Sequence, residues 1–193
     1  MKISIDEITI LILAGGAGRR VGGNDKGLLN YGKESLISQQ VGWAERQSNK
    51  LIISANRNKS KYQKYNYPVV EDQGGGFRGP LYGVLAALKR CQTKWLFVQP
   101  IDLLCLPENT LQLMLDKLSA NTSSAYLVSN TREHYLSMLI ERGYYSLLEK
   151  YLLDGHSKVS SFHRLANSQK LNLGFSEEKF RNLNRFEDYQ VLP

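Results

Sequence analysis

Three times in its first 120 residues, the chain passes from a short apolar run through a loop into a stretch whose apolar residues have helical spacing. The first of these runs, residues 8–13, is nearly unbroken, as in strands that are buried on both faces. Alternation of buried strands with amphipathic helices is typical of a parallel sheet that carries helices on both faces. The sequence therefore predicts an α/β fold, Rossmann-like and three-layered, around a mostly parallel mixed sheet.

The expected elements follow one another without an internal repeat, a low-complexity tract or a linker. In the first 120 residues, strands are expected at 8–13, 51–55, 67–71 and 95–98, and helices at 34–48, at 59–65, from Pro80 and from Pro107. Past residue 121, strands are expected at 124–129 and 135–141, and helices at 144–153 and 159–165. A chain of 193 residues suffices for one sizeable core, so residues 1–193 are predicted to form a single domain.

The chain carries a net charge of +7, which favours an anionic partner, either nucleic acid or a phosphorylated small molecule. The densest basic stretch, residues 57–64, comes without a basic arm, zinc-finger spacing or aromatic RNA-binding motif, so nucleic acid is the less favoured partner. The longest apolar run is too short to cross a membrane, and the first residues lack the features of a signal peptide. Two isolated cysteines, Cys91 and Cys105, indicate reduced thiols, so the cytoplasm is the expected compartment, with no membrane partner.

The loop after the first strand, residues 13–26, has the sequence LAGGAGRRVGGNDK, with five glycines, two arginines and a lysine. It is not a P-loop, because Lys26 follows Asp25 and not glycine, and it lacks the third glycine of the dinucleotide fingerprint. A third interpretation is a clamp on a nucleoside triphosphate, in which backbone N–H groups approach the phosphates and Arg19 and Lys26 supply two cations. Asp25 is then expected to orient Lys26. A plain glycine-rich turn with solvated arginines explains one or two of these glycines, but not the whole set.

Asp102 lies just beyond the expected strand at 95–98, at the sheet edge where ligands of open parallel sheets bind. Magnesium takes hard oxygen ligands and shares them with substrate phosphates, so one carboxylate can suffice. The alternative for Asp102 is a helix cap or a turn. No arrangement of serine, histidine and aspartate, or of cysteine and histidine, indicates a protein nucleophile, which is consistent with phosphoryl-type transfer.

Residues 13–29 resemble the signature loop of the nucleotidyltransferases and, more narrowly, that of the bacterial molybdenum cofactor guanylyltransferases, whose pattern is LAGGxxxRMGG.DK. Five further segments resemble motifs of that family in the same order. They are 54–57 (NANR in the family), 70–72 with 79–81 (an acidic element and GPL), 100–102 (PxD), His134 (HPT), and 182–184 with 187–188 (NVNTPED). The chain departs from the family at Ser54, Val21, 103–104, 135–136 and 185–186.

The resemblance implies a Rossmann-like nucleotidyltransferase fold and an enzyme that joins GTP to molybdopterin. The terminal phosphate of the pterin attacks the α-phosphorus of GTP, and pyrophosphate leaves. Residues 1–120 are then the nucleotide-binding half and residues 121–193 the acceptor-binding half. The implied cofactor is Mg²⁺, and the implied partners are GTP, molybdopterin and, transiently, proteins that make or accept the molybdenum cofactor.

Carried over onto this chain, the resemblance implies catalytic roles for Arg19, Lys26 and Asp102, with Asp102 as the metal ligand. The residues expected to contact the nucleotide are Leu13, Ala14, Gly15, Gly16, Lys26, Ser54, Asp72, Gly79, Pro80, Leu81 and Asp102. Asn182 and Asn184 contact the acceptor phosphate or a metal-bound water, or else simply form a turn. His134 is expected to make a structural hydrogen bond, because a phosphate nucleophile is already ionised near neutral pH.

Two other functions remain open at this point. One is a related nucleotidyltransferase that uses CTP or another nucleoside triphosphate with a different phosphorylated acceptor. The other is a non-catalytic GTP-binding protein that escorts the cofactor, against which Asp102 argues, because a pure binder has no need of a metal-binding carboxylate.

Overall fold

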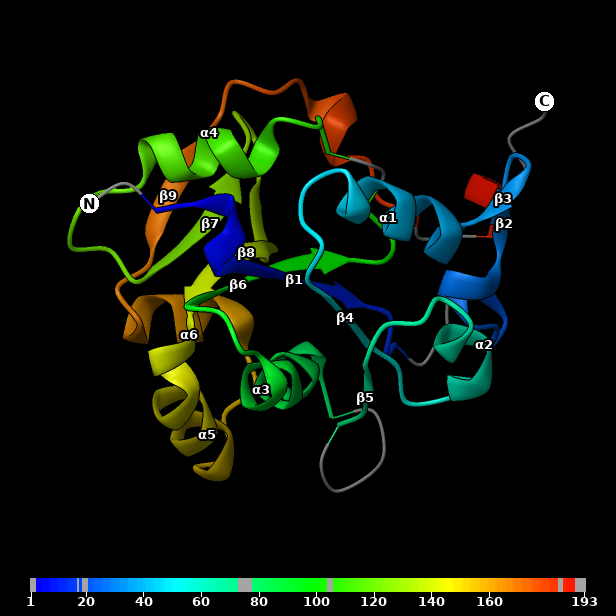
Figure 1. Ribbon diagram of the computed structural model, residues 1–193, viewed down its shortest axis with the longest axis horizontal. Coiled ribbons are helices and arrows are strands. Elements are labelled where there is room, and N and C mark those ends of the chain that lie inside the picture. The colour runs from blue at the N-terminus through cyan, green and yellow to red at the C-terminus, as the bar shows by residue number, and fades with distance from the viewer. Residues whose placement is uncertain are drawn as a thin grey trace.

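The computed structural model describes residues 3–16, 18, 21–72, 78–103, 106–183 and 186–189. For residues 186 and 187 it describes the backbone alone. Its centre is a seven-stranded sheet with the strand order β5-β4-β1-β6-β8-β7-β9 (Figure 1). The strands are β1 (Ile8–Leu13), β4 (Leu51–Ser54), β5 (Val69–Val70), β6 (Trp95–Pro100), β7 (Ser124–Val128), β8 (Glu133–Glu141) and β9 (Gln169–Asn172). A short hairpin, β2 (Asn30–Tyr31) with β3 (Glu34–Ser35), lies outside this sheet.

The first four strands of the sheet are parallel, since β1 pairs in parallel with both β4 and β6, and β4 pairs in parallel with β5. β8 is antiparallel to its two neighbours, β6 and β7, and β9 returns parallel to β7. The sheet is therefore mixed and mostly parallel, and the predicted fold class is confirmed. Because β8 joins β6 to the strands that follow, the two halves of the chain share one sheet.

Helices cover both faces of the sheet (Figure 1). One face carries α1 (Leu36–Glu45) and α4 (Thr110–Lys117), and the other carries α3 (Pro80–Arg90), α5 (Tyr145–Leu153) and α6 (Val159–Leu165). Successive residues of β1 alternate between the two cores, with Ile10 and Ile12 in one and Leu11 in the other. The short helix α2 (Lys59–Gln63) buries Tyr62 in the first of these cores. None of the helices among the described residues combines the length and apolar character needed to cross a membrane.

Several element boundaries differ from the prediction. The helix expected from Pro107 begins at Thr110, because the carbonyl of Pro107 accepts hydrogen bonds from the backbone N–H and the hydroxyl of Thr110 in a preceding turn. The helix expected at 34–48 begins only at Leu36, where the hydroxyl of Ser35 caps it by accepting from the N–H of Ser38. β9, in which only Leu171 is buried, was not predicted from the sequence.

The carboxyl ends of β1, β4, β5 and β6 meet at one edge of the sheet, since these strands run in parallel. β8 runs the other way, so its first residues lie at that same edge, together with the last residues of β7. The loops that follow β1, β4 and β6 and the loop between β7 and β8 therefore all belong to this edge, called the carboxyl edge below.

Candidate functional site

The loops after β1 and β6 meet through Lys26 and Asp102. Lys26 begins a single 3₁₀ turn, η3 (Lys26–Leu28), and Asp102 lies two residues beyond the end of β6. The Nζ atom of Lys26 donates to Oδ2 of Asp102 at 2.8 Å and to the carbonyl of Leu183 at 3.2 Å. Both side chains stay partly accessible, at 17% and 27% exposure. A cation and a carboxylate, predicted separately to bind phosphate and metal, thus lie together at the carboxyl edge.

A segment near the C-terminus backs this pair. The backbone N–H of Leu183 donates to the carbonyl of Asp102 at 2.8 Å, and Asn182 forms an antiparallel bridge with Leu103. Asn182, a predicted acceptor-binding residue, is therefore beside the strand end that carries Asp102, and it is exposed. Asn184, the other predicted asparagine, lies outside the described residues.

Tyr189, in η6 (Phe186–Tyr189), packs behind this segment. Its hydroxyl donates to the carbonyl of Leu183 at 3.3 Å. Burial, with the negative charges of Asp102 and Asp188 nearby, raises the pKa of Tyr189 to about 12. The hydroxyl therefore stays protonated and keeps its role as a donor.

The glycine-rich loop folds back on itself at Gly18. This residue has φ +65°, and a Cβ added there would lie 1.9 Å from the carbonyl oxygen of Asn24. The carbonyl of Gly18 accepts from the N–H groups of Val21 at 2.9 Å and Gly23 at 3.0 Å. Only glycine meets both demands, a left-handed backbone and a close approach of two chain segments. Arg19, the second predicted cation of the loop, lies outside the described residues.

Arg57, to which the sequence analysis gave no role, holds the outer part of this loop. Its Nη1 and Nη2 atoms donate to the carbonyls of Gly23 and Asn24, each at 2.6 Å. Its Nε atom lies 3.8 Å from Oδ2 of Asp25. The guanidinium therefore joins the loop after β4 to the loop after β1, just before Lys26. The sequence signal for Arg57 was its place in residues 54–57, which resemble the family's NANR motif, although that signal does not reveal what the side chain contacts.

Asp25 was expected to orient the Lys26 side chain. Its carboxylate instead makes its hydrogen bonds beneath the loop. Its carboxylate accepts from the hydroxyl of Tyr62 at 2.5 Å and from Nδ2 of Asn58 at 3.0 Å. Asp25 is only 8% exposed, so these bonds satisfy a buried charge. Burial and the bond to Asp25 raise the pKa of Tyr62, which keeps its hydroxyl protonated. Asp25 thus fixes the backbone from which Lys26 projects.

Asn56 links the start of the glycine-rich loop to Asp72. Its Nδ2 atom donates to Oδ2 of Asp72 at 2.8 Å and to the carbonyl of Gly15 at 3.2 Å, and its Oδ1 atom accepts from the N–H of Asp72 at 2.9 Å. Burial raises the pKa of Asp72, while the hydrogen bond from Asn56 and the charge of Arg78 oppose that shift. Three loops that were predicted to contact the nucleotide are therefore joined by one amide.

Ser54 ends β4 beneath these loops. It is completely buried, and its Oγ atom has no hydrogen-bond partner. A Cβ added to Gly83 of α3 would lie 2.6 Å from that oxygen, so the helix packs directly against it. The hydroxyl of Ser54, at a position where the family has asparagine, is therefore not accessible to solvent.

The other predicted nucleotide-binding residues also lie at the carboxyl edge. Gly79 caps α3 with φ +118°, and Pro80 is the first residue of the helix. Leu81 is 1% exposed and buries its side chain in the core beneath α3. The backbone of Leu13, Ala14, Gly15 and Gly16 leads out of β1, and a Cβ added to Gly16 would meet no atom within 4 Å.

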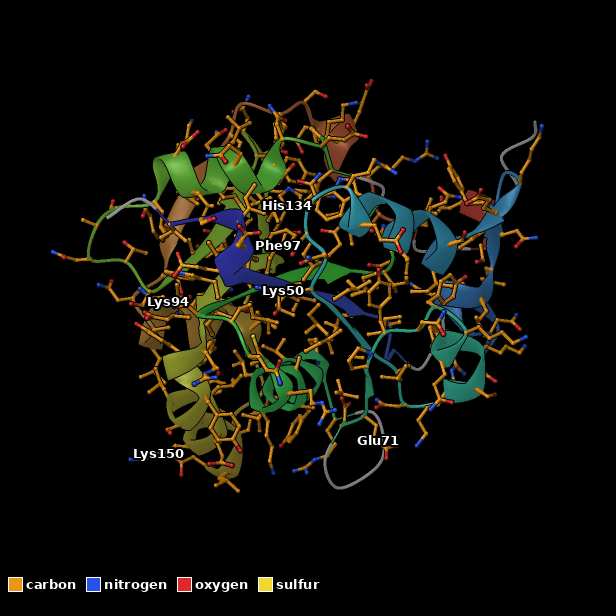
Figure 2. All side chains as sticks on the ribbon, in the orientation of Figure 1. Lys50, Glu71, Lys94, Phe97, His134 and Lys150 are labelled. Atoms are coloured by element: carbon orange, nitrogen blue, oxygen red, sulfur yellow. The ribbon has the colours of Figure 1, made fainter. Side chains whose placement is uncertain are left out.

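His134 makes structural contacts. Its ring stacks on Phe180 with 3.9 Å between centroids, and its Nε2 atom shares a hydrogen bond of 3.1 Å with the hydroxyl of Ser129. In Figure 2 it lies above Phe97 of β6, on the side of the sheet that carries α4 and α1. Burial lowers the pKa of His134, so the ring is neutral at physiological pH.

The donor set at the carboxyl edge suits a magnesium ion that is shared with substrate. No group of three histidine, cysteine, aspartate or glutamate side chains in the described part of the chain is arranged as a metal cage. Asp102 offers a partly exposed carboxylate, a hard oxygen donor. Mg²⁺ commonly takes one or two carboxylates and completes its shell with waters and phosphate oxygens, so Asp102 fits the ion that the sequence analysis expected.

The comparisons with known proteins agree with these motifs. Residues 10–170 match the family described as the MobA-like NTP transferase domain. A molybdenum cofactor guanylyltransferase from Haemophilus influenzae is 34% identical over 186 residues, which cover 94% of this chain and 95% of the relative. One from Shewanella sediminis is 31% identical over 193 residues, which cover 100% of this chain and 97% of the relative.

Solved structures resemble this one in fold. Molybdopterin-guanine dinucleotide biosynthesis protein A from Archaeoglobus fulgidus has a TM-score of 0.75 and 18% identity, with 95% of this chain and 94% of that chain covered. A nucleotidyl transferase from Methanothermobacter has a TM-score of 0.73 and 15% identity, with 94% of each chain covered. At such identities the likeness concerns the fold alone.

Proposed function

The chain belongs to the MobA-like NTP transferase family and is a nucleotidyltransferase of its molybdenum cofactor guanylyltransferase group, and on this premise we propose that it transfers GMP from GTP to the terminal phosphate of molybdopterin. The products are molybdopterin guanine dinucleotide and pyrophosphate. The contact that best supports the proposal is the 2.8 Å hydrogen bond between Lys26 and Asp102, a phosphate-binding cation beside a carboxylate suited to magnesium.

The proposed reaction makes one bond and breaks one bond. An oxygen of the acceptor phosphate attacks the α-phosphorus of GTP, the bond from that phosphorus to the α–β bridging oxygen breaks, and the electron pair leaves with pyrophosphate. The attacking phosphate is already ionised near neutral pH, so the reaction needs no general base. The neutral, stacked ring of His134 is consistent with this, since it leaves that side chain a structural role.

The side chains of this site then act by charge and position. Lys26 binds the β- and γ-phosphates and stabilises the leaving pyrophosphate, while its bond to Asp102 keeps its ammonium aimed at the carboxyl edge. Arg19 supplies a second cation, as the family resemblance implies. Asp102 would hold Mg²⁺, which when bound neutralises phosphate charge and helps to align the reacting groups.

Nucleoside contacts are proposed for the loops that Asn56 joins, from Leu13 to Gly16 and at Asp72. The start of α3, residues 79–81, contributes to the pocket for guanine. Asn182, which is exposed beside Asp102, contacts the acceptor phosphate. The proposed compartment is the cytoplasm, an expectation that rests on the isolated cysteines, of which Cys91 is buried and free.

The test is pyrophosphate release from GTP by the purified protein with Mg²⁺ and a molybdopterin-bearing acceptor. Release is expected to require both substrates and to stop when EDTA removes the metal. Faster release from CTP than from GTP would reject the guanylyl assignment in favour of another nucleotidyltransferase. Tight GTP binding without any pyrophosphate release would favour a non-catalytic escort.

A further inference from the structure

A cavity of about 530 Å³ opens in the second half of the chain, and no residue so far assigned to the site lines it. Its walls come from β7, β8, β9 and α6, and they include Tyr126, Glu133, Tyr135, His163, Arg164 and Lys170. Pockets for small organic ligands occupy roughly 300–1,000 Å³, so the cavity has room for a bicyclic ring with substituents.

Three aromatic rings meet in this cavity. The centroid of Tyr126 lies 5.2 Å from that of Tyr135 and 4.4 Å from that of His163, and the rings of Tyr135 and His163 stack at 5.8 Å. His163 is held by bonds to the carbonyl of Tyr135 at 2.8 Å and to the hydroxyl of Ser168 at 2.9 Å. Burial lowers the pKa of His163, so its ring is uncharged. A fixed aromatic surface of this kind favours stacking with a planar heterocycle.

Glu133 supplies a carboxylate beside these rings. Its Oε1 atom accepts from the hydroxyl of Tyr126 at 3.0 Å and from Nζ of Lys170 at 2.6 Å, and its Oε2 atom accepts from the hydroxyl of Tyr135. The bonds from Lys170 and the two tyrosines lower the pKa of Glu133 to about 2, so it stays ionised. A carboxylate offers about four lone-pair positions, so Oε2 retains one for an N–H donor of a ligand.

The rim of the cavity is positively charged. Lys158, Arg164 and Lys170 line it, against the single carboxylate of Glu133. The hydroxyl of Ser161 accepts from Nη2 of Arg164 at 3.1 Å, which restrains the guanidinium. The lining therefore suits a ligand that presents an N–H donor to Glu133 and carries negative charge on its substituents.

One end of the cavity, at Glu133, lies at the same sheet edge as Asp102. β8 begins at Glu133 and runs antiparallel to β6, which ends two residues before Asp102. The pairing of β7 with β8 also shifts between Tyr126 and Leu127, whose partners are Met138 and His134. Such an irregularity redirects side chains, here beside Tyr135. Figure 1 shows α6 on the face of the sheet that also carries α3, whose first residues are proposed to contact guanine.

From this geometry we infer that the cavity binds the pterin ring of the acceptor, stacked on Tyr135 with its amino-pyrimidine edge at Glu133. The inference rests on the proposed function, since that reaction brings a pterin to the enzyme. A pterin is planar and carries N–H donors on its pyrimidine edge, and its acidic substituents match Lys158 and Arg164.

The inference is tested with neopterin, a fluorescent pterin without phosphate, titrated into the purified full chain. Quenching of its fluorescence is expected on stacking against Tyr135. Glu133→Gln and Tyr135→Ala are each expected to raise the Kd for neopterin about tenfold, as loss of one charged hydrogen bond or one stacking partner implies. The matched control is Glu149→Gln on α5, where the hydroxyl of Tyr145 donates to Glu149 at 2.6 Å outside the cavity, and its Kd is expected to equal that of the unaltered protein.

Arg164→Ala tests the same site without touching its interior, because this side chain is exposed. It is expected to raise the KM for molybdopterin about tenfold while GTP affinity, the melting temperature and kcat stay unchanged. Absence of quenching, or equal Kd values in Glu133→Gln and the unaltered protein, overturns the inference even where GTP-dependent pyrophosphate release upholds the proposed function. A different result separates the two claims. If the unaltered protein quenches neopterin and Glu133→Gln does not, but the unaltered protein releases no pyrophosphate, the pterin site is supported and the proposed function is overturned.

Discussion

Lys26 and Asp102 are 76 residues apart in the chain, yet their side chains share a hydrogen bond of 2.8 Å. Lys26 also donates to Leu183, so two of its three N–H groups are used by protein acceptors. No acceptor among the described residues takes the third, which can bind an anionic ligand. The ammonium is thus held in position before GTP arrives, which lowers the entropic cost of binding the triphosphate.

Asp102→Asn is expected to lower kcat by about 10²–10³-fold, the range found when one electrostatic contact to a reacting phosphate or oxyanion is lost. The melting temperature should change little, because the amide oxygen still accepts from Lys26. Initial rates of pyrophosphate release and thermal unfolding provide the two measurements. Turnover near that of the unaltered protein would remove Asp102 from the mechanism.

Asp72→Asn is expected to raise the melting temperature at pH 7. Burial raises the pKa of Asp72 in the folded chain, so this carboxyl favours the folded state below its unfolded pKa and loses that contribution as the pH rises through the folded pKa. At neutral pH the buried charge therefore costs stability, and asparagine removes the cost. The gain should shrink between pH 7 and pH 4, and GTP affinity should fall, since Asp72 is proposed to contact the nucleotide.

Thermal unfolding over that pH range measures the stability effect of Asp72→Asn, and calorimetric titration with GTP measures the loss of affinity. Asp154→Asn, in the exposed turn after α5, is the matched control and should leave both unchanged. If Asp72→Asn instead lowers the melting temperature at pH 7, the ionised carboxylate of Asp72 stabilises the folded chain.

Among the structural elements, the glycine-rich loop depends on Arg57. Arg57→Lys replaces a planar fork, whose two nitrogens reach the carbonyls of Gly23 and Asn24 separately, with a single nitrogen that cannot keep both bonds in that geometry. The KM for GTP is expected to rise about tenfold, a loss of about 1.4 kcal/mol, with kcat nearly unchanged. Arg46→Lys, at an exposed pair with Glu108, is the control that should not alter KM. If the KM of Arg57→Lys equals that of the unaltered enzyme, the loop keeps its shape without the two guanidinium hydrogen bonds of Arg57.

Gly83→Ala is expected to destabilise the fold. A Cβ there would lie 2.6 Å from Oγ of Ser54 and 2.7 Å from Cδ1 of Leu13. Overpacking of this kind costs about 1–3 kcal/mol. This outweighs the gain in helix propensity of about 1 kcal/mol. Gly42→Ala in α1 is the matched control, since its Cβ would meet nothing nearer than 3.6 Å, and it should raise the free energy of unfolding in urea. If Gly83→Ala and Gly42→Ala stabilise the fold equally, α3 moves away from Ser54 and Leu13 without an energetic cost.

The elements that bury an apolar stripe were predictable from sequence. The strand expected at 8–13 is β1, because a short unbroken apolar run matches a strand buried on both faces, and the helix expected from Pro80 is α3, because its buried leucines and valine repeat at helical spacing. β9 was missed because it is an edge strand with a single buried side chain, Leu171. The helix start at Thr110 was missed because a turn around Pro107 resembles the first turn of a helix.

The site was predictable in part for a related reason. Lys26 and Asp102 follow buried strands of a parallel sheet, so topology alone brings them to one edge. The family resemblance found in the motifs is confirmed by the comparisons. Arg57 and Asn56 act on backbone carbonyls of distant loops, and a sequence does not reveal such contacts. The cavity lined by Glu133 and Tyr135 depends on side chains from four elements and left no local pattern.

For the molecule as a whole, the shared sheet predicts a single unfolding transition. β6 of the first half pairs directly with β8 of the second, and Leu183 bonds to Asp102 across the same boundary. Trp43 and Trp95 are both buried in the first half, whereas far-ultraviolet circular dichroism reports on both halves. The two signals are expected to change at the same urea concentration. A tryptophan transition that precedes or follows the dichroism change would reveal two independent folding units.

The contact between Lys26 and Leu183 spans 157 residues, so its two partners leave the ribosome at very different times. The phosphate-binding loop and Asp102 are both made well before the segment that braces them. A nascent or prematurely released chain that stops short of residue 182 lacks the backbone bond to Asp102 and the carbonyl that anchors Lys26. The braced arrangement of Lys26 and Asp102 is thus complete only after this final stretch has been translated.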